Sequence, residues 1–257
     1  MPRFFADPEQ IGQQTVTLVG DDAHHISRSL RMAVGEEITV TNGRGTEYRC
    51  RLTEFLPDRV CAEILESHPC DAEPPFIATV WQALPKGEKL DSIIQKSVEC
   101  GASEIRLFES SRCIVRIRDG EKDKKTERRQ RIALEAAKQC GRGMIPPVVS
   151  PVRFEEAVNA AADADLPLFC YEGEETEPLS AVLHRFHAAR ENANVRPRIA
   201  VMVGSEGGFS EAEANRAKEA GMIPVGLGKR ILRTETAAAF VLGCLVYEFE
   251  LSDVQKM

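Results

Sequence analysis

Two glycine-rich turns in the last quarter of the chain carry the residue types best suited to hold a ligand. The first is Gly204-Ser-Glu-Gly-Gly-Phe209, which follows the apolar run Arg198–Val203. It precedes Ser210-Glu-Ala-Glu213, a capping-box pattern that opens helices. The sequence therefore predicts a strand-to-helix turn. Glycines let the backbone approach a ligand closely, and open parallel sheets bind ligands at this edge.

The second glycine-rich turn also contains basic residues. It runs Gly226-Leu-Gly-Lys-Arg-Ile-Leu-Arg-Thr-Glu-Thr-Ala237 and also follows a strand-like run. Thr234 is predicted to cap the last helix, whose positive end and neighbouring Arg233 would attract an anion. Arg233 could instead pair with Glu206 or Glu235. Together the two turns predict one pocket built mostly from backbone.

Neither turn matches a phosphate-binding loop. The first has Gly-Gly-Phe-Ser where a Walker A loop needs Gly-Lys-Ser/Thr. Its G-x-x-G-G spacing also differs from the G-x-G-x-x-G of dinucleotide-binding folds. A nucleoside triphosphate and a dinucleotide are therefore poor fits.

The cysteines and histidines suggest no metal. The eight cysteines include no C-x-x-C pair, and the five histidines lack zinc-finger spacing. The first residues lack a signal-peptide core, and no run is long enough for a membrane span. We therefore expect a cytoplasmic protein with free thiols, no metal and no membrane partner.

Charge is unevenly distributed. The net charge is −7, yet residues 112–143, the basic block, hold eleven Lys and Arg against five Asp and Glu. Such a block inside an acidic protein can follow a nucleic-acid backbone, although it is also typical of a solvated helix face.

The hydrophobic pattern divides the chain in two. The first 70 residues predict a small β-barrel with strands at Gln14–Val19, Glu37–Thr41, Tyr48–Phe55 and Arg59–Leu65, and a short helix at Asp22–Arg31 that Asp22 could cap. A polar, proline-containing linker is predicted at Ser67–Pro75. Strands and helices then alternate: Ile77–Ala83, Leu90–Cys100, Glu104–Phe108, Lys125–Cys140, Leu166–Tyr171, Arg198–Val203 and Thr234–Phe249. This alternation predicts an α/β domain with a parallel sheet covered on both faces.

At this point the motifs resemble a known family. Gly204–Phe209, Leu227–Ala237 and Ala136-Ala-Lys-Gln-Cys-Gly-Arg142 together are similar to the RsmE family of SPOUT-class methyltransferases. Arg3-Phe-Phe5, the stretch His24–Arg31 and Ile93-Ile-Gln-Lys96 also fit. The resemblance covers nearly the whole chain. One departure is Ser205, where the family usually has proline.

The resemblance implies a fold, a reaction and a cofactor. The expected fold is a SPOUT-type trefoil-knotted α/β domain at 73–257, preceded by a PUA-like RNA-binding β-barrel at 1–72. The expected reaction is methylation of N3 of one uridine in small-subunit (16S) rRNA, near the decoding centre, with S-adenosyl-L-methionine as methyl donor. The expected substrate is 16S rRNA or the 30S subunit, and the expected assembly is a homodimer, with its interface on the apolar last helix.

Residue roles follow from the matching positions. The expected cofactor contacts are Tyr171, Glu172, Gly204, Glu206, Gly207, Gly208, Leu227, Gly228, Ile231, Leu232 and Arg233. Arg233 is the candidate to stabilise the anion that forms when N3 loses its proton, and Glu206 could orient Arg233 or accept that proton. Water or another carboxylate is left open as the acceptor. The expected RNA contacts are Arg3, His24, Arg28, Arg31, Arg112, Arg116, Arg118, Lys122, Lys124, Lys125, Arg128, Arg129 and Arg142.

Two other functions stay open from the sequence. Gly-Ser-Glu-Gly also occurs in SPOUT ribose 2′-O-methyltransferases, although those enzymes typically carry a Ser-Leu-Asn motif where this chain has Leu-Arg-Thr-Glu-Thr. A non-catalytic RNA-binding protein of ribosome assembly would need only the PUA-like part.

Overall fold

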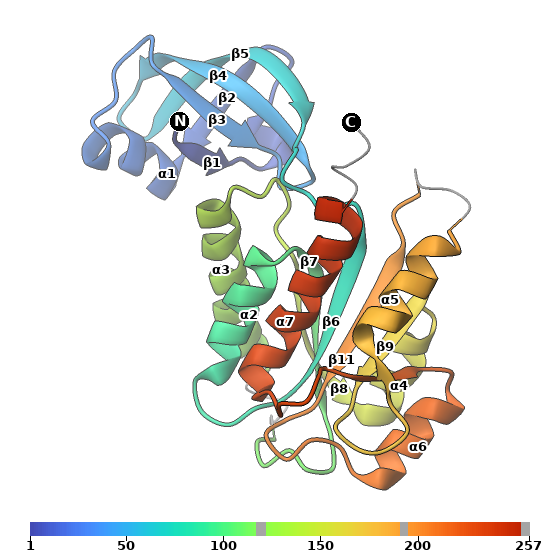
Figure 1. Ribbon diagram of the computed structural model, residues 1–257. Coiled ribbons are helices and arrows are strands. Elements are labelled where there is room, and N and C mark those ends of the chain that lie inside the picture. The colour runs from blue at the N-terminus through green and yellow to red at the C-terminus, as the bar shows by residue number, and fades with distance from the viewer. Residues whose placement is uncertain (117–121, 191–194, 253–257) are drawn as a thin grey trace. The chain divides into compact units, whose positions relative to one another are not determined.

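The chain forms two compact units in a computed structural model that describes residues 1–116, 122–190 and 195–252 (Figure 1). Unit 1 consists of Met1–Glu73 together with Ala137–Ile145. Unit 2 consists of Pro74–Ala136 and Pro146–Met257. Each unit has its own sheet, and the long helix α3 (Lys122–Cys140) contributes residues to both.

Unit 1 is a small β-structure whose described residues form a five-stranded sheet in the order β1-β3-β4-β5-β2. Its strands are β1 (Arg3–Phe5), β2 (Thr15–Val19), β3 (Glu37–Thr41), β4 (Thr46–Phe55) and β5 (Arg59–Pro69). β1 lies parallel to β3, and the other pairings are antiparallel. Alternate residues such as Ile38 and Val40 are buried, because one face of the sheet covers the core.

Two short helical segments close this core. The 3-10 turn η1 (Pro8–Gln10) follows β1, and α1 (Gly20–His24) continues into the π-helical turn η2 (His25–Ser29). Ile26 is buried within the core. Asp22 lies in the first turn of α1 rather than at its cap, which is Val19, so the predicted capping role is wrong. The Asp22 carboxylate instead accepts a hydrogen bond from Lys138 Nζ at 3.2 Å.

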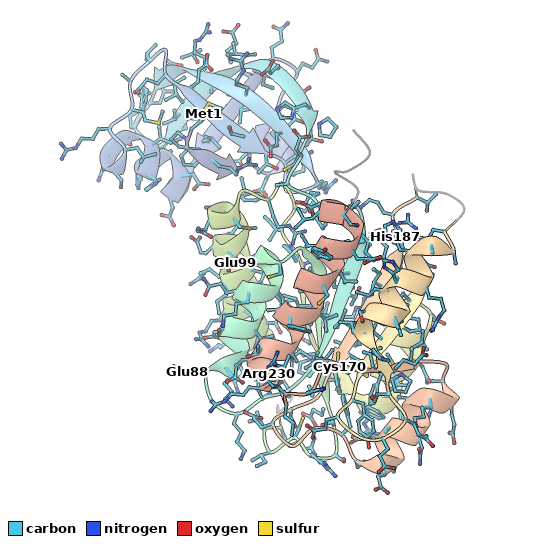
Figure 2. The ribbon with its side chains drawn as sticks, viewed as in Figure 1. Met1, Glu88, Glu99, Cys170, His187 and Arg230 are labelled. Carbon is cyan, nitrogen blue, oxygen red and sulfur yellow. The ribbon has the colours of Figure 1, made fainter. Side chains whose placement is uncertain are left out.

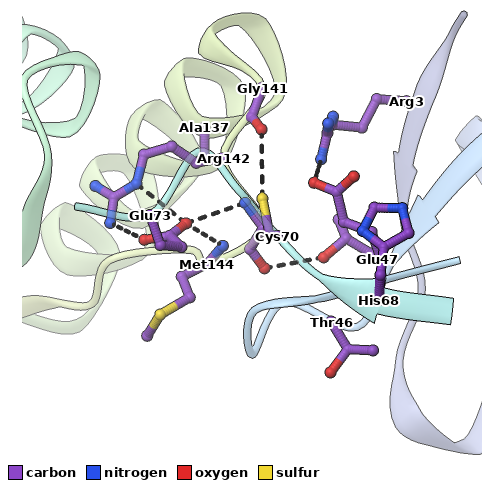
Figure 3. A network of polar contacts seen from close by, with 12 residues as sticks. Arg3, Thr46, Glu47, His68, Cys70, Glu73, Ala137, Gly141, Arg142 and Met144 are labelled. Atoms are coloured by element: carbon purple, nitrogen blue, oxygen red, sulfur yellow. Dashed lines mark hydrogen bonds and ion pairs between the residues drawn. The ribbon is translucent and has the colours of Figure 1, made fainter. Parts of the chain in front are cut away.

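The segment Ala137–Ile145 is held in unit 1 by buried polar contacts (Figure 3). One carboxylate oxygen of Glu73 accepts hydrogen bonds from the N–H groups of Gly143 and Met144 at 3.0 and 2.9 Å. The other accepts one from Arg142 Nη2 at 2.7 Å. Thr41 Oγ1 donates to the carbonyl of Gly143 at 2.9 Å. These bonds satisfy groups that would be costly to bury alone.

Unit 2 is built on a sheet that, in the described residues, has seven strands in the order β10-β12-β9-β11-β6-β7-β8. The strands are β6 (Ile77–Ala83), β7 (Ala102–Glu109), β8 (Val148–Arg153), β9 (Leu166–Cys170), β10 (Glu177–Pro178), β11 (Arg198–Val203) and β12 (Ile223–Gly226). Every pairing in this sheet is parallel. The carboxyl ends of the central strands therefore meet at one edge.

Helices cover both faces of this sheet, as the alternating pattern predicts. The helices are α2 (Lys89–Glu99), α4 (Phe154–Ala162), α5 (Leu179–Ala188), α6 (Glu211–Glu219) and α7 (Thr234–Val246), and α7 continues into η4 (Tyr247–Leu251). In Figure 1, α2 and α7 pack together in front of the sheet and α4 lies behind it. The chain leaves β12 beside β9 and crosses back to start α7 near β11 and β6; this is the segment in which the expected knot would be tied.

Two differences from the predicted elements have local causes. β5 extends to Pro69 because its polar end pairs with β4, so the predicted linker at Ser67–Pro75 begins as a strand. β1 escapes periodicity analysis because it has three residues. Each cysteine is a free thiol. The described residues hold no helix long and apolar enough to cross a membrane, and no His, Cys, Asp or Glu cluster arranged for a metal ion.

Candidate functional site

A cavity of about 520 Å³ lies at the carboxyl edge of the unit 2 sheet. Its walls come from the segments that follow β9, β11 and β12, and from the first turns of α2 and α7. Figure 2 labels Cys170 and Arg230 at this edge. Burial raises the pKa of the Cys170 thiol to about 12, so this side chain stays neutral.

The turn after β11 is fixed by tight backbone packing. The Gly208 N–H donates to the Ser205 carbonyl at 2.9 Å, and Gly208 has a φ of +63°, which glycine adopts without strain. A Cβ on Gly204 would lie 3.1 Å from Gly208. Phe209 anchors the end of the turn, because its ring packs 4.3 Å from that of Phe169 in the core. The turn is therefore a rigid wall.

A single buried amide joins the wall to the start of α7. Gln82 Nε2, on β6, donates to Thr234 Oγ1 at 2.9 Å, and Thr234 Oγ1 donates to the Gly204 carbonyl at 2.6 Å. The N-cap of α7 is Arg233, and no side chain bonds to this cap. The predicted capping role of Thr234 is thus wrong: its hydroxyl instead bonds to the Gln82 amide and to the Gly204 carbonyl.

The segment after β9 forms the facing wall. Tyr171 and Glu172 both line the cavity, as does Thr176. Gly173 is required beside them, since a Cβ there would lie 2.3 Å from the Tyr171 ring. A Cβ on Gly208 would lie 3.1 Å from Glu172 Oε1, so the two walls approach each other closely here.

Glu206 is held ionised at the cavity rim. Its carboxylate accepts hydrogen bonds from the Lys86 N–H at 3.0 Å and pairs with Lys89 Nζ at 3.0 Å. Burial would raise the pKa of Glu206, but hydrogen bonds from Lys89 and from backbone N–H groups outweigh it and hold that pKa below its ordinary value. The same contact raises the pKa of Lys89.

Arg233 pairs with the other candidate carboxylate. Its Nη1 lies 3.9 Å from Glu235 Oε1, whose second oxygen lies 3.7 Å from Lys89 Nζ. Lys89 therefore stands between Glu206 and Glu235. The Arg233 side chain remains 82% exposed, so its charge is available to a ligand.

The structure brings most of the predicted cofactor contacts together around this cavity. Those that line it are Tyr171, Glu172, Gly204, Glu206, Gly208, Leu227, Gly228, Ile231, Leu232 and Arg233. Gly207 is outside the lining, and its carbonyl accepts a hydrogen bond from Arg112 Nη1 at 2.7 Å. Sequence reasoning missed Lys89 and Gln82, because a lysine at the start of a helix and a glutamine in a strand carry no motif.

The predicted RNA contacts of the basic block are largely engaged within unit 2. Arg112 holds Gly207, Arg116 contacts Glu109 at 3.3 Å, and Arg128 pairs with Asp91. Lys124 and Lys125 are exposed on α3, and Arg129 is half-buried. Arg118 lies outside the described residues, and nothing is described of the Lys122 side chain.

In unit 1 the predicted RNA contacts fall into two groups. His24, Arg28 and Arg31 are exposed along α1 and η2. Arg3 is half-buried and pairs with Glu47, and Arg142 is 2% exposed and pairs with Glu73. This burial against Glu73 favours a structural role for Arg142, and its contact with RNA stays a prediction.

Comparison with known proteins assigns the class. Residues 72–246 match a family model described as an RNA methyltransferase domain, and residues 18–65 match one described as an RNA methyltransferase PUA domain. The sheet, the edge cavity and the small β-rich unit are thus those of an RNA methyltransferase with a PUA domain.

Relatives that match over nearly their whole length identify the family within this class. Ribosomal RNA small subunit methyltransferase E of Bacillus subtilis is 33% identical over 254 residues, which is 98% of each chain. The chain therefore belongs to the ribosomal RNA small subunit methyltransferase E family. A crystal structure of such a protein from Neisseria gonorrhoeae bound to S-adenosyl methionine is 33% identical, with a TM-score of 0.78 over 96% of this chain and 97% of that one. A putative methyltransferase from Legionella pneumophila with bound cofactor SAM is 30% identical, with a TM-score of 0.77 over 95% and 96%. The predicted SPOUT-type α/β fold with an N-terminal PUA-like domain is confirmed.

Proposed function

We propose that this protein is an S-adenosylmethionine-dependent methyltransferase acting on N3 of a uridine in 16S rRNA, in the cytoplasm. The observation that carries the proposal is the cavity between the segments that follow β9, β11 and β12. Family membership supports methyl transfer to small-subunit rRNA, and the choice of uridine N3 is our own inference.

The residues present fit the proposed methyl donor. The cavity is large enough for a bent nucleoside-bearing molecule, and backbone at Gly204, Gly208, Gly226 and Gly228 lines it. A Cβ at Gly208 would press against Glu172 on the opposite wall, and one at Gly204 would press against Gly208 within its own turn, so both positions favour glycine. When bound, the cofactor supplies the methyl group, and this chain supplies the binding, the orientation and the charge.

Arg233 is the proposed catalytic residue. Methylation at N3 requires that the N3–H bond break, which leaves negative charge on the uracil oxygens. A guanidinium beside them would stabilise that charge, and Arg233 is exposed at the cavity and cannot lose its own charge. Glu206 is a weak proton acceptor, because its low pKa makes it a poor base. Its better-supported role is to position Lys89.

A second copy of the chain is proposed to complete the assembly. One face of α7 is buried, but Phe240 on α7 and Tyr247 at the start of η4 are 40% and 67% exposed, with exposed Gly243 between them. These positions share one helix face. An apolar stripe on the helix that begins at the cavity is suited to a dimer interface. Light scattering should report a dimer, and Phe240→Glu should yield monomer.

The deciding experiment is methylation in vitro with the product nucleoside identified. Naked 16S rRNA and assembled 30S particles, both from a strain lacking the enzyme, are incubated with the protein and S-adenosylmethionine. Mass spectrometry of the digested RNA should find a base-methylated uridine. A ribose-methylated nucleoside would contradict the uridine N3 assignment, and absence of S-adenosylmethionine binding would favour a non-catalytic RNA-binding role.

A further inference from the structure

The loop between β12 and α7 carries two exposed cations, Lys229 and Arg230. Lys229 and Arg230 line the cavity, and both are exposed. Among the described residues, neither side chain has a hydrogen bond or an ion pair. Lys86 is a third exposed cation; it is outside the cavity lining, but its backbone N–H donates to the rim residue Glu206 at 3.0 Å, so its backbone lies next to the rim.

The contrast with the basic block makes these cations informative. Within that block, Arg112, Arg116 and Arg128 each contact an acceptor in unit 2. Part of the positive charge of the basic block is therefore engaged in contacts that stabilise the fold of unit 2. Lys229 and Arg230 contribute little to the local charge count, yet their charge remains open to solvent.

We propose that Lys229 and Arg230, assisted by Lys86, form a cationic rim that binds the phosphates on either side of the target nucleotide. This inference rests on the proposed function. A base that enters the cavity leaves its flanking phosphodiesters at the mouth, where each carries one negative charge. Lysine and arginine at that distance neutralise the phosphates and hold the strand without reading its sequence.

A carboxylate of the methyl donor is the competing anion for the same cations. The rim fits RNA better because two neighbouring exposed cations exceed what one carboxylate needs, and because the side chains reach solvent rather than the cavity floor. The two kinds of contact can be distinguished by the salt dependence of RNA affinity. Each phosphate contact steepens the fall of RNA affinity with salt concentration, and a contact to the cofactor does not.

The test uses the full-length double variant K229Q/R230Q. Its affinity for in vitro transcribed 16S rRNA is measured over a series of KCl concentrations, and its affinity for S-adenosylmethionine is measured by calorimetry. Each single-strand phosphate contact contributes about 0.7 to the salt slope, so loss of two should reduce the slope by roughly 1.4. S-adenosylmethionine affinity should stay within about twofold, and each single variant should reduce the salt slope by about 0.7, which is half of the reduction expected for the double variant.

Lys96→Gln is the matched control. Lys96 is exposed and has no ion pair within the described part of the chain. It lies in the last turn of α2, the helix that begins at Lys89, and is outside the cavity lining. This variant should keep the wild-type slope. An unchanged slope in K229Q/R230Q would overturn the rim, and loss of S-adenosylmethionine binding with an unchanged slope would assign these cations to the cofactor. If wild-type protein binds RNA with the rim-dependent slope but methylates nothing, the rim stands and the proposed function fails.

Discussion

The amide of Gln82 lies 2.9 Å from the hydroxyl of Thr234, although 152 positions separate the two residues in the chain. Both side chains are buried, and both lie within hydrogen-bonding distance of the Gly204 carbonyl. One pair thus connects β6, the turn after β11 and the first residue of α7. The shape of the cavity depends on this connection, because each of the three segments enters it from a different part of the chain.

Thr234→Val tests this connection. The substitution keeps the shape of the side chain but leaves the Gln82 amide and the Gly204 carbonyl without the hydroxyl between them. We expect a loss of about 1–3 kcal/mol in the free energy of unfolding and weaker S-adenosylmethionine binding. Urea unfolding and calorimetry measure the two effects. Thr236→Val, at an exposed position one residue past Glu235, should change neither by much; equal effects in both variants would remove the special role of Thr234.

Gly173→Ala should displace the wall after β9. The new Cβ would lie 2.3 Å from the Tyr171 ring, so that ring has to move out of its place beside Phe169. We expect lower stability and lower S-adenosylmethionine affinity, seen by thermal unfolding and calorimetry. Adding G173A to the Y171A variant should cause little further loss of stability, because the ring with which the new Cβ would clash is absent from Y171A. Additive losses in the double variant would contradict the clash.

Arg233→Ala should abolish methyl transfer and leave the fold intact. The side chain is 82% exposed and makes one long ion pair, so its removal should cost less than about 1 kcal/mol of stability. Single-turnover methylation of 16S rRNA at saturating S-adenosylmethionine is the measurement. Arg233→Lys retains a charge without the planar donor geometry and should recover only part of the rate. Wild-type turnover in the alanine variant would refute the assigned role.

Glu213 should make stability depend on pH on the acid side. Burial would raise its pKa, but hydrogen bonds from Ser111 and Ser210 outweigh burial and lower it. Because the folded-state pKa lies below the unfolded one, the contribution is present above the unfolded pKa of about 4.3 and is lost as pH falls through the folded value. Wild type should exceed Glu213→Gln in unfolding free energy at neutral pH, and the gap should close in acid. Glu211→Gln, at an exposed position of the same helix, retains Glu213 and should therefore lose stability in acid as wild type does.

Arg142→Met should destabilise unit 1 strongly. The Glu73 carboxylate would remain buried with only the Gly143 and Met144 N–H groups as donors. Breaking a buried pair from one side costs about 3–5 kcal/mol. Hydrogen exchange of β3 and β4 amides reports on this unit alone. Arg49→Met provides the comparison, because Arg49 pairs with Glu37 and Glu66 on the exposed face, where solvent screens the charges, and its loss should cost far less stability than that of Arg142.

Periodicity predicted the unit 2 sheet well because its strands are buried runs bounded by turn residues. Ile77–Ala83 and Arg198–Val203 have the bounds that the sequence indicates. The short strands β1 and β10 could not be found in this way, since they exist only through pairing with β3 and β12. Likewise, no local signal shows that Ala137–Ile145 belongs with the first 73 residues, because the contacts that hold it there are between distant positions.

The site was predictable where the backbone determines it and unpredictable where side chains cross the fold. The glycines at 204 and 208 identify the ligand-binding turn in the sequence, but no local pattern predicts the hydrogen bond between Gln82 and Thr234. The basic block illustrates the reverse error: charge counting cannot distinguish exposed Lys124 from Arg142, whose charge is buried against Glu73.

The two-part composition of unit 1 has a consequence for synthesis. As the chain leaves the ribosome, Met1–Glu73 emerges first, but Thr41 and Glu73 must wait for Arg142 and Gly143. At roughly 5–20 residues per second, the interval lasts several seconds, during which Met1–Glu73 exists without the segment Ala137–Ile145 that completes unit 1. The order of folding is therefore set by α3: unit 1 begins to form first, yet it cannot be completed before Pro74–Ala136, the first segment of unit 2, has been made.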